Sequence, residues 1–188
     1  MLLYLLSRIC IKITMKKTIF LLPILILILS SQQVNDPTDE LIRIRIENRY
    51  IQPMEAFGEP LFCTTTLPQF YQQRVFQPAW SSGMARQLIQ AITKAGEEGL
   101  QPTDYHLELL KQKVNPFPEK PLELANLDMM LTDAFLLYAS HLLSGKVNPE
   151  TIDADWHVVR REGDPVKVLE QAINSGEIEN SLLELLPK

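Results

Sequence analysis

One long apolar stretch between Pro121 and Gly145 limits the folds that this chain can adopt. Its apolar side chains recur every three or four residues, which is the period of an α-helix. The main stripe consists of Leu124, Leu127, Leu131, Phe135, Tyr138 and Leu142. Further apolar residues, such as Met130 and Leu136, lie off that stripe and widen it. Because a helix that is apolar on several sides is buried on several sides, we predict a central helix over about 122–143, ended by Gly145.

Shorter amphipathic patterns predict further helices before and after the central one. The run Ser81-Ser82-Gly83 and Asp164 each offer an N-cap, because a side-chain oxygen there accepts a hydrogen bond from a free backbone N–H group. Gly99 and Gly176 are placed to end the same two helices, since glycine readily adopts the left-handed conformation of a helix C-terminus. The predicted helices begin near Leu67, Met84, Pro102, Pro165 and Ile178, and the last of them extends to Leu186.

A different pattern occurs over residues 42–46, where apolar and charged side chains alternate. Alternation is typical of a half-buried strand, here with Ile42, Ile44 and Ile46 on one face. Residues 61–64 predict a second short strand, and the two would form a hairpin-like pair. The whole pattern therefore predicts a mainly α fold with a small β element (α+β), in the form of a compact helical domain.

The first 31 residues have the layout of a secretory signal. The pair Lys16-Lys17 precedes an apolar run over 19–29, and small residues follow. This run is shorter than the roughly 20 apolar residues that a membrane span needs. We predict a leader over 1–31, with Met15 as an alternative start, and one domain over 32–188. An uncleaved N-terminal anchor is the alternative, and in both cases the domain is expected in the periplasm or cell envelope.

The charge of the chain excludes two classes of partner. It has 18 Lys and Arg against 23 Asp and Glu, a net charge of −5. No acidic residue precedes Asp36, so the part after the leader is more acidic still. Binding to DNA or RNA needs clustered basic residues, and docking on an anionic membrane needs them too. We therefore expect no nucleic-acid partner, and membrane contact only through an uncleaved leader.

Side chains that carry chemistry are few. The histidines, His106, His141 and His157, lack the spacing of a zinc site, and we predict no metal and no cofactor. Cys63 is the one cysteine after the leader, so the domain has no internal disulfide. Phe62 and threonines adjoin it rather than a base, which favours a small buried residue in a strand over a nucleophile.

Carboxylates and tryptophans allow a second interpretation, binding or hydrolysis of sugars. Asp153-Ala154-Asp155 and Glu97-Glu98 each bring two carboxyl groups close in sequence, and a glycosidase needs two that face each other across the substrate. Glu97-Glu98 is more simply an exposed helix end. Trp80 and Trp156 favour core anchors over sugar platforms, because large aromatic side chains dominate core packing.

Several runs together resemble, in order and spacing, the scaffold domain of the large periplasmic L,D-transpeptidases, enzymes that cross-link peptidoglycan. They begin with Phe70-Tyr71-Gln72-Gln73-Arg74, Gln77-Pro78-Ala79-Trp80 and Glu98-Gly99-Leu100-Gln101-Pro102-Thr103-Asp104-Tyr105-His106. They continue with 131–138, then His141-Leu142 and Ser144-Gly145-Lys146-Val147-Asn148-Pro149, and end with Trp156 and the Leu183, Leu186, Pro187 terminus. The resemblance covers about 42–187, nearly the whole domain.

In that family the scaffold is mainly helical and non-catalytic, and a catalytic domain with a His, a Ser/Thr-His-Gly run and a nucleophilic Cys follows it. No such run occurs here, and Cys63 lies at the wrong end of the domain. The resemblance therefore implies a scaffold module that is not an enzyme, truncated or split before the catalytic domain, with no catalytic residues of its own. Its implied partners are a transpeptidase catalytic domain and peptidoglycan, and its last segment is expected to leave an apolar face uncovered. A stand-alone carboxylate-dependent cell-wall hydrolase and an envelope adaptor protein remain as alternatives.

Overall fold

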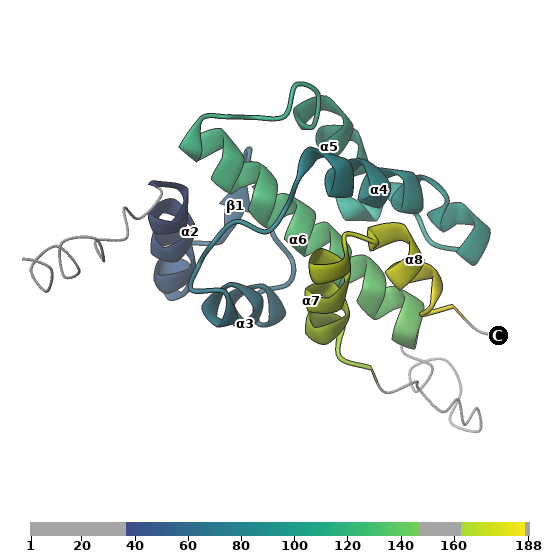
Figure 1. Ribbon diagram of the computed structural model, residues 1–188. Helices are drawn as coiled ribbons and strands as arrows, with labels where there is room; N and C mark the ends of the chain where they lie inside the picture. The colour runs from purple at the N-terminus through teal and green to yellow at the C-terminus, as the bar shows by residue number, and fades with distance from the viewer. Residues whose placement is uncertain (1–36, 147–162, 187–188) are drawn as a thin grey trace, which may run out of the picture. The chain divides into compact units, whose positions relative to one another are not determined.

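The computed structural model describes residues 37–146 and 163–186 and shows helices gathered around one long helix, with a single two-stranded sheet among the described residues (Figure 1). The α-helices are α2 (Pro37–Glu47), α3 (Thr66–Gln73), α4 (Ser82–Thr93), α5 (Leu107–Lys113), α6 (Pro121–Ser144), α7 (Pro165–Ser175) and α8 (Ile178–Leu183). Short 3-10 helices cover Asn48–Tyr50, Ala95–Glu98 and Pro102–Tyr105. The strands are β1 (Glu55–Ala56) and β2 (Glu59–Pro60). The predicted mainly α fold with a small β element is confirmed.

Helix α6 is the central element, as its apolar pattern predicts. It begins at Pro121, where a proline loses no helical hydrogen bond, and it ends before Gly145, which has a positive φ of 78°. Every residue from Leu127 to Leu136 is buried. Helices α2, α3, α4, α5 and α7 and strand β1 all contact it. Among the described residues no helix has the length and apolar character of a membrane span.

The prediction of a strand over 42–46 is wrong, because these residues belong to α2. Ile42 and Ile46, which are four residues apart, are fully buried on the side that packs against α6. Ile44 lies between them and is 44% exposed. Isoleucines at every second position fit a strand, in which all three would lie on one face. In a helix only residues three or four apart share a face, so Ile42 and Ile46 are buried and Ile44 is not.

The small sheet forms earlier in the chain than the predicted second strand over 61–64. Strands β1 and β2 are antiparallel, with Ala56 paired to Glu59. The two residues between them, Phe57 and Gly58, have positive φ angles of 53° and 83°. Positive φ at both central positions is the requirement of a type I′ turn, the tight turn that matches the twist of a hairpin. A hairpin is therefore present, but Cys63 follows it and lies outside any strand.

The predicted helix caps are mostly confirmed. Ser81 accepts a hydrogen bond from the Met84 N–H group, and Asp164 accepts one from Val166. Gly176 ends α7 in the left-handed conformation. Gly99 is also left-handed, but it ends the 3-10 helix that follows α4 rather than α4 itself.

The last segment is better covered than its sequence predicts. Helix α8 ends at Leu183, short of Leu186, and Ile178 and Leu182 on its apolar face are buried against α4 and α7. The side chain of Gln87 on α4 fixes the junction. Its amide nitrogen donates to the Gly176 carbonyl at 2.9 Å, and its oxygen accepts from the Ile178 N–H group at 2.8 Å. The predicted uncovered apolar face is therefore wrong for these residues.

We predict that Gln87→Ala destabilises the domain by about 1–3 kcal/mol, because it leaves backbone groups at the α7–α8 junction without partners. Hydrogen exchange of Ile178 and Leu182 should accelerate more than that of α6. Gln90→Ala, an exposed change on the same helix, serves as the control. Equal exchange rates in the two variants would show that Gln87 does not hold α8.

Candidate functional site

Three polar side chains lie inside the apolar core on α6. Asp128, Thr132 and Asp133 are each at most 1% exposed. Asp128 and Thr132 are four residues apart, so they lie on one side of the helix. A buried polar group without a hydrogen bond costs several kcal/mol, on the order of 2–7 by transfer measurements. The partners of these three residues therefore decide which parts of the chain can pack against α6.

The Asp128 carboxylate binds the connection between α3 and α4. It accepts a hydrogen bond from the Tyr71 hydroxyl at 2.6 Å, and from the backbone N–H groups of Ala79 and Trp80 at 2.9 and 3.0 Å. Burial raises the pKa of Asp128 to about 6, and these hydrogen bonds oppose the increase. The carboxylate thus takes the place of water for two backbone donors.

Thr132 fixes the indole of Trp80. The Trp80 Nε1–H group donates to the Thr132 hydroxyl oxygen at 3.0 Å, and the Tyr71 hydroxyl is 2.9 Å from the same oxygen. The Trp80 ring is 5% exposed and lies 6.2 Å from the ring of Phe135, measured between centroids. The prediction that Trp80 is a core anchor is confirmed, and its ring is not available to stack on a sugar.

Asp133 joins Cys63 to His106. One carboxylate oxygen accepts from the Cys63 backbone N–H group at 2.7 Å, and the other is 3.1 Å from Nε2 of His106. The other ring nitrogen of His106 is 2.8 Å from a Glu59 carboxylate oxygen. Burial by itself would lower the pKa of His106, but the hydrogen bonds to Asp133 and Glu59 outweigh it and raise that pKa above its ordinary value.

This Cys, His and Asp set is not a nucleophile with its base. The Cys63 thiol points to the Asp133 carbonyl oxygen at 3.7 Å, and burial together with the Asp133 charge raises its pKa to about 12. A nucleophilic cysteine needs a depressed pKa and a neutral imidazole to take its proton. Here carboxylates occupy both ring nitrogens of His106, so the imidazole has no free lone pair for the thiol. Cys63 is half-buried in a loop, so the prediction of a buried residue in a strand is wrong about the strand.

A cleft of about 420 Å³ opens beside His106. The exposed ring of Phe62 stacks on the His106 ring, and His141 lines the same cleft. The Tyr105 hydroxyl lies 2.9 Å from Nδ1 of His141, and Lys146 forms a 2.5 Å ion pair with Asp104. Burial and the charge of Lys146 lower the pKa of His141. Residues of the motif run 98–106 thus meet His141 and Lys146 from the later runs. The charged side chains of Asp104 and Lys146 are paired with each other, and Glu59 is paired with His106.

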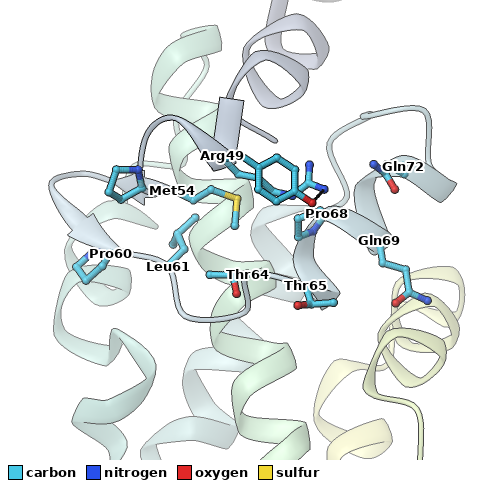
Figure 2. A pocket seen from close by; sticks show the side chains of 11 residues that line it. Arg49, Met54, Pro60, Leu61, Thr64, Thr65, Pro68, Gln69 and Gln72 are labelled. Carbon is cyan, nitrogen blue, oxygen red and sulfur yellow. Dashed lines mark hydrogen bonds between the residues drawn. The ribbon is translucent and has the colours of Figure 1, made fainter. Parts of the chain in front are cut away.

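A second concavity, a groove of about 490 Å³, is lined by residues around the hairpin and by α3 (Figure 2). Met54 and Leu61 flank β1 and β2 and contribute apolar surface. Gln69 and Gln72 of α3 contribute exposed amides, and Arg49 is the charged side chain in the lining. None of these residues is predicted as a site from the sequence. They come from a 3-10 helix, the loops around the hairpin and α3, which share no sequence motif.

Glu97 and Glu98 line neither of these two concavities. Glu97 and Glu98 are exposed at the end of a 3-10 helix, as expected. Asp153, Asp155, Trp156 and His157 lie outside the described residues. Over 37–146 and 163–186, no three His, Cys, Asp or Glu side chains are placed to hold a metal ion.

The buried polar side chains of α6, Asp128, Thr132 and Asp133, all form hydrogen bonds with other parts of the chain. In a comparison with protein families, the model described as "Scaffold domain" matches residues 65–188. That match covers the greater part of the sequence, so the chain belongs to the Scaffold domain family, a description consistent with a non-catalytic module. Searches of curated proteins and of solved structures gave no match.

We predict that Asp128→Asn removes a pH dependence of stability. The unfolded chain releases this proton near pH 3.8 and the native state near pH 6, so wild-type stability falls as pH rises between these values. The wild type should lose about 2 kcal/mol relative to Asp128→Asn between pH 4 and 7, measured by urea unfolding. Glu123→Gln, exposed at the start of α6, controls for the loss of one negative charge. A difference that is flat with pH would contradict the raised pKa.

We also predict that Cys63 reacts slowly with iodoacetamide at pH 8, because its thiol stays protonated. Mass spectrometry of the Cys63 peptide should show labelling slowed at least about tenfold relative to the unfolded chain, where the thiol has its ordinary pKa. Cys63→Ser should fold normally. Rapid labelling in the native protein would instead indicate an activated thiolate.

Proposed function

We propose that this chain is a non-catalytic scaffold module of an L,D-transpeptidase-like cell-wall protein, exported to the periplasm or cell envelope and active in peptidoglycan remodelling. It would act by holding a transpeptidase catalytic domain and a peptidoglycan strand next to each other. The family match supports the scaffold role, and the ordered motif runs support the link to the transpeptidases. The acidic charge and the signal-like first 31 residues support an exported protein without nucleic-acid partners.

One observation carries the proposal: the motif residues build the framework of the domain. Tyr71 and Trp80, from the first runs, are tied to Asp128 and Thr132 of α6. His106, from the third run, is tied to Asp133, and Tyr105 to His141. The motif residues therefore have an architectural role in this chain, which supports its interpretation as the same structural module.

The hydrolase alternative finds less support. Asp128 and Asp133 are buried and fully engaged in hydrogen bonds to the chain. In the cleft, Glu59 is paired with His106 and Asp104 with Lys146. A glycosidase needs one carboxyl that is free to protonate the leaving oxygen and a second that is free to attack or to activate water.

We predict that the protein sediments with purified peptidoglycan sacculi and releases no soluble muropeptides from them. A separately expressed L,D-transpeptidase catalytic domain should bind the protein and reduce hydrogen exchange on the contacted surface. The binding partners are tested separately, so each has its own result. An Asp128→Ala variant, which loses the α3–α4 tether, is the unfolding-prone control.

Release of muropeptides would contradict the scaffold role. Glu59→Gln and Asp104→Asn would then show whether the cleft carboxylates are responsible. If the protein folds normally but binds neither sacculi nor the catalytic domain, the scaffold proposal is wrong and the envelope adaptor is the interpretation that remains.

A further inference from the structure

The groove between the hairpin and α3 has the features of a ligand site. Its volume of about 490 Å³ lies within the roughly 300–1,000 Å³ of sites that bind small ligands and short peptides. Figure 2 shows the side chains of Met54 and Leu61 on one side and those of Gln69 and Gln72 on the other. The first pair is buried and apolar, and the second pair is exposed and polar.

Arg49 brings an unbalanced positive charge to this groove. No Asp or Glu of the described residues lies within ion-pair distance of its guanidinium, although the chain as a whole has a net charge of −5. The guanidinium is nevertheless held in place. It donates to the Ile46 carbonyl at 2.8 Å and to the Tyr50 hydroxyl at 2.7 Å, and it lies 4.2 Å from the centre of the Tyr50 ring.

These two hydrogen bonds leave further N–H donors of the guanidinium without a partner among the residues that the structure describes. A guanidinium that is fixed by neighbours and still has donors is preorganised for a carboxylate, which it binds through paired, charge-assisted hydrogen bonds. The opposite wall offers groups of another kind. The amides of Gln69 and Gln72 and the hydroxyls of Thr64 and Thr65 both donate and accept, as a peptide backbone requires.

We propose that this groove binds an extended peptide with a free C-terminal carboxylate, and that Arg49 is the anchor of that carboxylate. The amides of α3 would bind the peptide backbone, and the exposed rings of Pro53 and Pro60, which lie in the lining with Met54 and Leu61, would contact its apolar side chains. The proposal does not rest on the scaffold function above, because it concerns a different surface and a different measurement. A neutral glycan strand is the competing occupant, and it would have no need of Arg49.

The test uses the full chain and two probes, N-acetyl-tetra-alanine as the free acid and as the C-terminal amide. Chemical shifts of the Thr64, Thr65 and Gln69 backbone amides report on binding in the groove. The free acid should bind at least about tenfold more tightly than the amide, which is the expected size of one charge-assisted contact. Arg49→Gln should abolish this preference, whereas Arg86→Gln, exposed on α4 and outside the groove lining, should retain it.

Arg49→Gln also removes the bonds to Ile46 and Tyr50 and could loosen the loop, so a second variant is needed. Gln69→Glu leaves Arg49 intact and adds a negative charge to the exposed wall, which should weaken the acid probe about tenfold by competing for the guanidinium. Equal binding of acid and amide, or shifts that lie elsewhere in the domain, would overturn the proposal. Shifts of the same amides with chitotetraose, but not with the peptides, would overturn it in favour of a glycan.

Discussion

The segments that carry Cys63, Tyr71 and Trp80 pack against α6 by forming hydrogen bonds with three polar side chains that are buried there. Asp128, Thr132 and Asp133 occupy the centre of the apolar helix, and each takes its hydrogen bonds from chain segments distant in sequence. A hydrophobic surface alone tolerates many packings, whereas a buried carboxylate accepts only those that bring donors to it. Asp128 thereby fixes the turn at Ala79, and Asp133 fixes the backbone of Cys63 after the hairpin.

The same bonds explain why Cys63 and His106 are not arranged as a nucleophile with its base. Cys63, His106 and Asp133 lie together, which is the composition of a thiol hydrolase site. Asp133 stands between the other two, so the imidazole meets carboxylates and the thiol meets a carbonyl oxygen. The negative charge that raises the pKa of His106 also raises that of the thiol. An arrangement that stabilises the imidazolium and the neutral thiol is stable but unreactive.

The sequence predicts most helices of this domain because their signals are local: the apolar period of α6, and the caps Ser81 and Asp164. It fails at α2, where isoleucines at alternate positions fit two periods and only packing against α6 selects one. Gln87 and Arg49 were missed for another reason. Gln87 bonds to residues that are distant in sequence, and Arg49 lines a groove that separate elements form. Neither arrangement produces a pattern among neighbouring residues. Asp128 and Asp133 were not predicted either, although two acidic residues within an apolar helix are a pattern that the sequence itself contains.

Two of the buried groups make the domain respond to pH in one direction. Asp128 holds its proton more tightly in the native state than in the unfolded chain, and so does His106. A group with a raised native pKa contributes stability below its unfolded pKa and loses it as pH rises through the native one. For Asp128 this loss falls between pH 3.8 and about 6, and for His106 it lies above its ordinary value of 6.5. Their windows follow one another, so these two groups stabilise the native state most at low pH, and that contribution is lost as the pH rises through the two ranges.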